Sequence, residues 1–81
     1  MKITVLFFAQ ARERAGAASA QLELPDAARV SDALAALARA HPPLEALWPH
    51  LAVAVDGVLA RGEMQLRDGA ELALLPPVSG G

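Results

Sequence analysis

One segment in the middle of the chain restricts the fold more than any other. Across residues 30–41 most of the apolar side chains recur at helical spacing, which predicts an amphipathic helix. Ser31 or a residue just before Val30 should cap its first turn. Pro42 and Pro43 then end the helix, because proline has no backbone N–H and disfavours helical geometry at the residue before it. The chain therefore has one main helix, and its other elements must be arranged around it.

Two strands are expected before this helix. Residues 2–8 are rich in the β-branched and aromatic side chains that favour strands, and because they are apolar on both faces this strand should be central. Residues 18–24 predict a second strand, antiparallel to the first. Between the two, the polar residues 10–14 predict a loop or a single helical turn that ends at Gly16.

Three further strands are expected after the helix. Residues 51–55 and 58–60 flank Asp56-Gly57, a pair that readily adopts the positive φ angles of a type I′ hairpin turn. A second Asp-Gly pair precedes the last strand, residues 71–75. Residues 44–50 should form only a short turn or a one-turn helix.

The order of elements, ββαβββ, defines the expected fold. One helix can cover only one face of a sheet, so this order predicts an α+β protein of β-grasp, ubiquitin-like architecture, with a mixed sheet of four to five strands and one main crossover helix. The 81 residues have room for one such domain, at residues 1–75. Residues 76–81 are expected to extend from it as a flexible C-terminal tail.

The alternation of side chains along the strands predicts an apolar face that no helix covers. Neighbouring strand residues point to opposite faces, so the helix should be faced by Ile3, Val5, Phe7, Leu72 and Leu74. The opposite face then receives Leu6, Phe8, Ala73 and Leu75. Hydrophobic residues make up 54% of the chain, above the roughly 45–50% of an average domain, which agrees with apolar side chains on the surface. Exposed apolar patches tend to bind partners.

The composition argues against several classes of function. The net charge of −2, with acidic and basic residues spread along the chain, provides no basic face for nucleic acid and no polybasic membrane anchor. The absence of cysteine excludes thiol nucleophiles and cysteine zinc sites. The apolar run at residues 3–9 has only the minimum length of a signal peptide, about 7 residues, and no stretch approaches the ~18 residues of a membrane span. A cytoplasmic protein is therefore expected.

Few side chains are suited to catalysis. His41 and His50 flank a proline-rich turn without a nearby carboxylate, so we expect no metal site and interpret both as surface or half-buried residues. Ser79 lacks the G-x-S-x-G context of a hydrolase nucleophile. Arg12 and the polar residues around it form either a solvated turn or a polar contact site for a partner.

The C-terminal sequence LLPPVSGG provides a different candidate, the α-carboxylate of Gly81. Gly80 and Gly81 have no Cβ, so the backbone and the carboxyl carbon can enter a narrow cleft. Pro76 and Pro77 each fix φ and should direct the tail away from the domain. Fully extended, residues 76–81 reach roughly 20 Å, enough to enter a partner's active site. A carboxylate is a poor acyl donor, so it must first be activated, for example as an acyl-adenylate.

Three segments together resemble one known family. FFAQARERAG near the start, the Asp-Gly pair before the last strand, and PPVSGG at the end are similar to the small subunit of molybdopterin synthase, the MoaD family of ubiquitin-like sulfur carriers. The resemblance implies that an E1-like enzyme adenylates Gly81 with ATP and magnesium, with no cofactor bound permanently to this chain. A sulfur donor, such as a cysteine desulfurase or a rhodanese-like protein, then converts Gly81 to a thiocarboxylate. The synthase large subunit, in a heterotetramer, passes this sulfur to cyclic pyranopterin monophosphate to form the molybdopterin dithiolene.

The same resemblance assigns roles to individual residues. Gly80 and Gly81 form the reactive tail, and Arg12 makes a polar contact with the activating enzyme. Apolar contacts to partners come from Phe8, Leu59 and Leu75, although some relatives have an aromatic residue in place of Leu75. The tail segment that enters the partner also includes Pro76, Pro77, Val78 and Ser79.

Two alternatives use the same tail. A sulfur carrier for another pathway would serve thiamine, a thiolated tRNA base or cysteine. A ubiquitin-like modifier would instead join Gly81 to a target lysine through an isopeptide bond.

Overall fold

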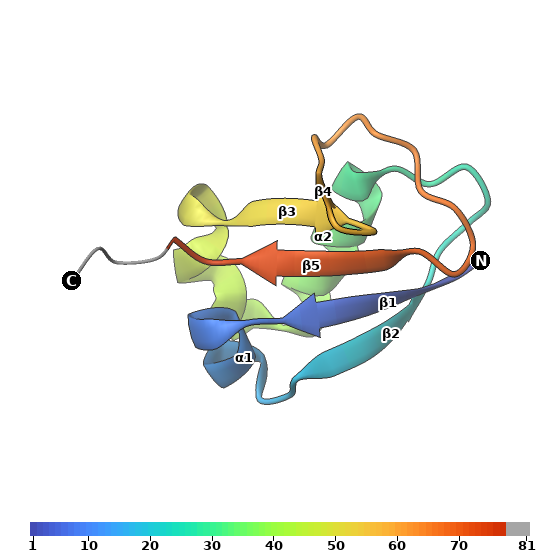
Figure 1. Cartoon of the computed structure of the whole chain (residues 1–81). Helices are drawn as coiled ribbons and strands as arrows, with labels where there is room; N and C mark the ends of the chain where they lie inside the picture. The colour runs from blue at the N-terminus through green and yellow to red at the C-terminus, as the bar shows by residue number, and fades with distance from the viewer. Residues whose placement is uncertain (78–81) are drawn as a thin grey trace.

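The computed structural model describes residues 1–77 as a five-stranded mixed sheet with its main helix on one face (Figure 1). The elements, in chain order, are β1 (Lys2–Phe7), α1 (Ala9–Ala15), β2 (Ser19–Glu23), α2 (Val30–Ala40), the 3-10 helix η1 (Pro42–His50), β3 (Ala52–Val55), β4 (Val58–Leu59) and β5 (Glu71–Leu75). The sheet order is β2-β1-β5-β3-β4, with β1 and β5 parallel and the other neighbours antiparallel. The expected α+β class and the central position of the first strand are confirmed.

Helix α2 is the helix that the sequence predicts, and its first turn is tied to two other parts of the chain. Arg29 caps it, and the backbone N–H of Arg29 donates to the Asp32 Oδ2 atom at 2.8 Å, so the cap is the residue before Val30 and not Ser31. The N–H groups of Val30 and Ser31 donate to the carbonyls of Met64 and Gly62, each at 2.9 Å. The loop before β5 therefore satisfies donors that a helix start leaves unpaired.

Two helical segments are longer than expected. Residues 10–14 belong to a seven-residue helix, α1, which ends where Gly16 adopts a left-handed conformation (φ 75°) and donates its N–H to the Arg12 carbonyl at 3.0 Å. Phe8, predicted as the last residue of the strand, is the N-cap of α1. Helix η1 spans nine residues, and its Leu44 and Leu47 side chains are buried. Burial of these side chains explains how a proline-rich stretch becomes an ordered helix.

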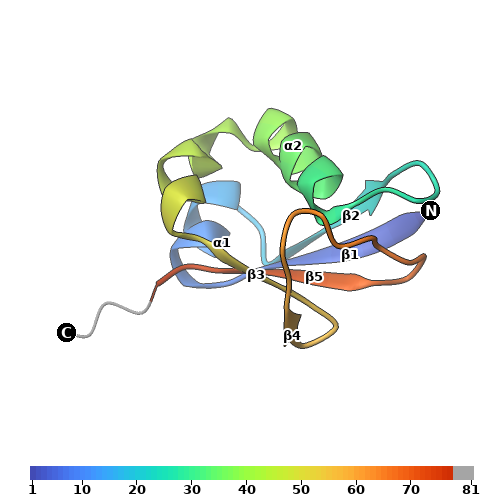
Figure 2. The same cartoon turned by 90° about the horizontal axis from the view of Figure 1, so that it is seen from above.

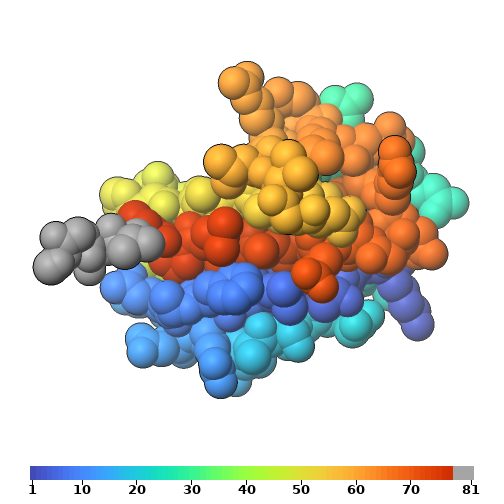
Figure 3. Space-filling view, in the orientation of Figure 1, coloured from blue at the N-terminus to red at the C-terminus, as the bar shows by residue number. Residues whose placement is uncertain are grey.

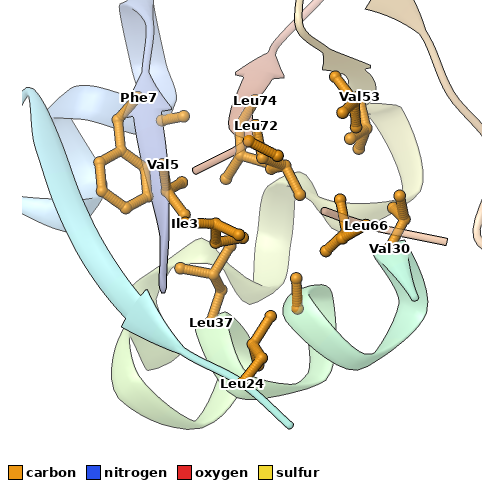
Figure 4. Close-up of a cluster of buried hydrophobic side chains, with 14 of the residues drawn as sticks. Ile3, Val5, Phe7, Leu24, Val30, Leu37, Val53, Leu66, Leu72 and Leu74 are labelled. Atoms are coloured by element: carbon orange, nitrogen blue, oxygen red, sulfur yellow. The ribbon is translucent and has the colours of Figure 1, made fainter. Parts of the chain in front are cut away.

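The core lies between the sheet and α2 (Figures 2 and 4). Figure 2 shows α2 and η1 on the same side of the sheet. As predicted, the β1 and β5 residues that face α2 are fully or almost fully buried: Ile3, Val5, Phe7, Leu72 and Leu74. They meet Val30, Ala33 and Leu37 of α2. Each large side chain buried here stabilises the fold by roughly 1.5–3 kcal/mol.

Both Asp-Gly pairs form turns that dock onto the sheet. Asp56 (φ 49°) and Gly57 (φ 83°) make the type I′ turn between β3 and β4, and the Asp56 Oδ1 atom accepts the Glu71 N–H at 3.0 Å. Asp68 Oδ1 accepts the Lys2 N–H at 2.8 Å, and Gly69 (φ 82°) donates its N–H to the Lys2 carbonyl at 2.7 Å. These contacts position β5 between β1 and β3.

Candidate functional site

The face of the sheet opposite α2 is divided into a polar half and an apolar half. At the start of β1, the cross-strand neighbours are polar: Lys2 Nζ lies 3.8 Å from Glu23 Oε1, and Gln21 Nε2 donates to Thr4 Oγ1 at 3.1 Å. Toward the end of β1 the side chains on this face become apolar. The change occurs between Thr4 and Leu6, which are successive residues on the same face.

The apolar half is built from four strands by their register. Leu6 lies beside Ala73, Ala73 opposite Ala54, and Ala54 opposite Leu59, so one apolar row crosses β1, β5, β3 and β4. A second row contains Leu75 and its partner Ala52, and Phe8 follows β1 in an extended conformation on the same face. We call these residues together the apolar face patch: Leu6, Phe8, Ala52, Ala54, Leu59, Ala73 and Leu75.

Among the large side chains of the apolar face patch, exposure is greatest at Leu59 and Phe8. Leu59 is 72% exposed and Phe8 is 45% exposed, whereas Leu6, Ala73 and Leu75 are half-buried. Figure 3 views this face directly and shows the red β5 between the blue β1 and the yellow to orange residues of β3 and β4. Large side chains exposed beside half-buried ones are suited to fill pockets on a partner.

The chain leaves the domain at the edge of the apolar face patch. Leu75 ends β5, Pro76 is half-buried, and Pro77 is exposed. Figure 1 shows that β5 ends on the same side of the molecule as the end of β1 and the start of α1. The predicted roles of Val78, Ser79, Gly80 and Gly81 lie outside the described residues. Within the described part, the segment leading to the diglycine starts directly after Leu75, and the Phe7–Leu74 register places the end of β1 beside it.

Arg12 lies in the seven-residue helix α1, where the sequence predicted a loop or a single helical turn. Its side chain is exposed, and it borders a shallow hollow of about 540 Å³ that is otherwise formed by Ala9, Glu13, Gly16, Ala17 and Ala18. The N–H of Arg12 points to the carbonyl of Phe8 at 3.4 Å. The exposed Arg12 side chain and the apolar face patch residue Phe8 are therefore close together along the chain.

Neither histidine forms part of this site. The His41 ring packs edge-on against Phe7, with ring centroids 5.3 Å apart and the planes inclined by 68°, and His50 is exposed. The predicted surface or half-buried positions are thus confirmed. Among residues 1–77, no three His, Asp or Glu side chains come together in a way that could hold a metal ion.

Sequence reasoning missed part of the patch. Ala52 and Ala54 were not named, and they join it because β3 pairs with β5. Leu59 was expected as a partner contact only from the family resemblance, and the structure places it opposite Ala54 in the same row. The Asp56-Gly57 turn, which sets the β3–β4 register, was the signal that could have placed Leu59 opposite Ala54. Val58 and Met64 are also exposed and had not been singled out.

The fold, the apolar face patch and the diglycine sequence define a small ubiquitin-like protein with the β-grasp fold. In the described residues, no helix has the length and apolar character needed to cross a membrane. The chain belongs to the ThiS family, whose sequence profile matches residues 5–81.

Two known proteins are similar in sequence to this chain over at least 91% of its length. It is 40% identical to the molybdopterin synthase sulfur carrier subunit of Chlamydomonas reinhardtii, over 100% of both chains. It is also 40% identical to small archaeal modifier protein 1 of Haloferax volcanii, over 91% of this chain and 94% of the relative. The chain is thus a sulfur carrier of the type to which these proteins belong, and the two names leave its pathway open.

Two solved structures support the same assignment. The crystal structure of SAMP1 from Haloferax volcanii covers 100% of both chains with a TM-score of 0.92 at 37% identity. A protein-protein complex of subunits 1 and 2 of the molybdopterin-converting factor from Helicobacter pylori matches over 100% of both chains, with a TM-score of 0.73 at 26% identity. A protein of this fold is therefore known in complex with a partner subunit.

Proposed function

We propose that this chain is the sulfur carrier subunit of a molybdopterin synthase and that the α-carboxylate of Gly81 carries the sulfur. The observation that supports this most is the apolar face patch beside the Pro76-Pro77 segment, in a chain that aligns over its whole length with a sulfur carrier subunit. A partner that binds the patch would receive the diglycine next to it. The sulfur chemistry would then occur in the partner's active site.

The proposed sulfur loading has two steps. A carboxylate oxygen of Gly81 attacks the α-phosphorus of ATP, which releases pyrophosphate and leaves an acyl-adenylate. The terminal sulfur of a donor persulfide then attacks the acyl carbon and displaces AMP, and a second thiol cleaves the resulting acyl disulfide to leave a thiocarboxylate. An E1-like enzyme would supply the ATP and magnesium site, and the persulfide would come from a cysteine desulfurase or a rhodanese-like protein. The chain itself would bind no permanent cofactor.

The proposed sulfur transfer takes place with the synthase large subunit. Burial of Phe8, Leu59 and Leu75 against that subunit would hold the domain, while residues 76–81 reach the pterin substrate. The thiocarboxylate sulfur is anionic at neutral pH and polarisable, so it is a good nucleophile toward cyclic pyranopterin monophosphate. Because loading uses ATP, a cytoplasmic location forms part of this proposal.

The test is to incubate the protein with its activating enzyme, ATP, magnesium and a sulfur source, and to measure its intact mass. A sulfur carrier gains the mass difference between sulfur and oxygen. Adding the large subunit and cyclic pyranopterin monophosphate should then produce molybdopterin and return the original mass. Loading without any pterin product would contradict the synthase assignment and favour a carrier of another pathway.

A second candidate function is protein modification, and a specific observation favours it. The relative from Haloferax volcanii with 40% identity is named a small archaeal modifier protein, and SAMP1 from that organism has a closely similar fold. In that case Gly81 would form an isopeptide bond to a lysine of another protein. Conjugates of higher mass in the same ATP-dependent reaction would reveal this activity.

A further inference from the structure

The outer strand of the sheet, β2, has hydrogen-bonding groups directed away from the domain. Met1 and Leu24 exchange hydrogen bonds at 2.7 and 2.9 Å, and the Phe7 N–H donates to the Ala18 carbonyl at 2.9 Å. Hydrogen-bonded pairs alternate along an antiparallel ladder, so Ala20 and Leu22 also pair with β1. The N–H and C=O groups of the intervening residues point outward: Ser19, Gln21 and Glu23.

These outward groups have no backbone partner among residues 1–77. In this described part of the chain β2 pairs only with β1, and no turn or loop hydrogen bond reaches Ser19, Gln21 or Glu23. Figure 1 shows β2 as the outermost strand of the sheet. An edge strand of this kind is a template for another strand, and a charged residue often protects it. Here the only charged residue in the strand is Glu23.

We propose that β2 pairs with β2 of a second copy of this chain, antiparallel, about a two-fold axis at Gln21. Three residue pairs then face each other: Ser19 with Glu23 of the second copy, Gln21 with Gln21, and Glu23 with Ser19. All three are the outward-pointing residues, so every pair can exchange two hydrogen bonds. The two sheets become one continuous sheet.

The side chains of β2 are compatible with this register on both faces. On the open face, each Glu23 is opposite an uncharged Ser19, and the Gln21 amides can hydrogen-bond to each other. On the face toward α2, Ala20 is opposite Leu22 of the second copy, and both side chains are half-buried next to the core. No like charges meet across the two strands.

The residues at the end of β2 favour this register over registers that are shifted along the strand. Pro25 has no N–H, and its carbonyl already accepts the Ala28 N–H at 3.2 Å, so pairing cannot continue past the strand. A register centred on Glu23 would place two Glu23 carboxylates opposite each other, which is unfavourable. The register centred on Gln21 is therefore the one that uses every outward group of the strand.

This pairing does not use the proposed partner site. The apolar face patch is built on β1, β5, β3 and β4, and β4 is the opposite edge of the sheet. Two paired copies would therefore each keep their Phe8 and Leu59 side chains exposed. The inference does not rest on the proposed function, because it uses only the hydrogen-bonding groups and side chains of β2.

The test is sedimentation equilibrium over a wide range of protein concentration, with charge variants at Ser19. Ser19→Glu places a carboxylate opposite Glu23 in two symmetric pairs and should raise the dimer dissociation constant about tenfold. The matched variant Ser19→Lys should lower it. Combining Ser19→Glu with Glu23→Lys should restore association. A wild-type protein that stays monomeric up to the concentrations used for NMR would refute the proposal, as would two Ser19 variants that shift the constant in the same direction.

Amide hydrogen exchange distinguishes this dimer from association through the apolar face patch. In the monomer, the amides of Ala20 and Leu22 should be protected, whereas those of Ser19, Gln21 and Glu23 should exchange fast. Raising the protein concentration should slow exchange at the Ser19, Gln21 and Glu23 amides, because these become hydrogen-bonded in the dimer. Association that leaves them exchanging fast, and that Phe8→Asp abolishes, would instead place the contact on the apolar face patch and overturn the proposal.

Discussion

Leu59 and Ala54 lie directly opposite each other in the β3–β4 hairpin, yet Leu59 is 72% exposed and Ala54 only 7%. A small side chain in the sheet is thus enclosed while its large neighbour remains open to solvent. The exposed leucine stabilises little in the isolated domain, because its apolar surface is still in contact with water. Its surface is available for a partner.

Leu59→Asp should weaken binding to the partner, because it places a charge in an apolar contact. For a central interface residue we expect a loss of about 2 kcal/mol, roughly thirtyfold in affinity, measured by titration calorimetry with the synthase large subunit. Val58→Asp is the matched control, since Val58 is 65% exposed but points to the other face of β4. Equal losses for both variants would mean that Leu59 has no specific role.

Phe8→Asp should weaken the same binding and leave the fold intact, because Phe8 is 45% exposed and follows β1 at the edge of the patch. The measurement is the same titration, with circular dichroism to check the fold. An unchanged affinity would remove Phe8 from the interface.

Deleting Gly81 should abolish sulfur loading while the fold and the affinity for the large subunit stay nearly unchanged. The reason is that the acyl carbon is displaced by one residue, whereas the apolar face patch is untouched. Intact-mass analysis after the loading reaction measures the first effect, and calorimetry measures the second. A deleted protein that no longer folds would contradict the idea that the tail is separate from the domain.

Leu72→Ala should destabilise the domain by about 2–5 kcal/mol, a large part of the stability of a small protein. Leu72 is fully buried against α2 on β5. Leu75→Ala is the matched control in the same strand. Leu75 is half-buried on the open face, so truncating it should lower the free energy of unfolding by less. Urea unfolding of both variants measures the difference, and a smaller loss at Leu72 would contradict the assignment of faces.

Gly57→Ala should destabilise the domain, whereas Gly62→Ala should not. Gly57 has a φ of 83° and open space where a Cβ would lie, so alanine there is strained only through its backbone, by about 1 kcal/mol. At Gly62 the φ is not in the left-handed region, and a Cβ would make an ordinary contact with Ser31 Cβ at 3.6 Å. Alanine at this position should be neutral or stabilise by up to about 1 kcal/mol. Thermal unfolding provides the comparison, and equal destabilisation would contradict the turn geometry.

The elements with strong local signals were predicted well from the sequence. Pro42 ended the main helix, Asp56-Gly57 formed the hairpin turn, and β5 has the predicted bounds. Segments without a strong pattern were underestimated. A seven-residue helix such as α1 is too short to be stable alone, and it forms because Ala11 is buried in the core. Helix η1 depends in the same way on its buried leucines.

Strand alternation is a local property, so it was enough to predict which side chains lie on the face away from the helix. The two terminal glycines were likewise enough to propose a reactive tail. The folded structure was needed to show that Leu6, Ala73 and Ala54 lie in one row with Leu59, since β1, β5 and the β3–β4 hairpin are far apart in the chain. The β1–β5 and β5–β3 registers depend on non-local strand pairing, whereas the Asp56-Gly57 turn sets the β3–β4 register locally. The same pairing left β2 at the edge of the sheet, with the outward hydrogen-bonding groups on which the proposed dimer depends.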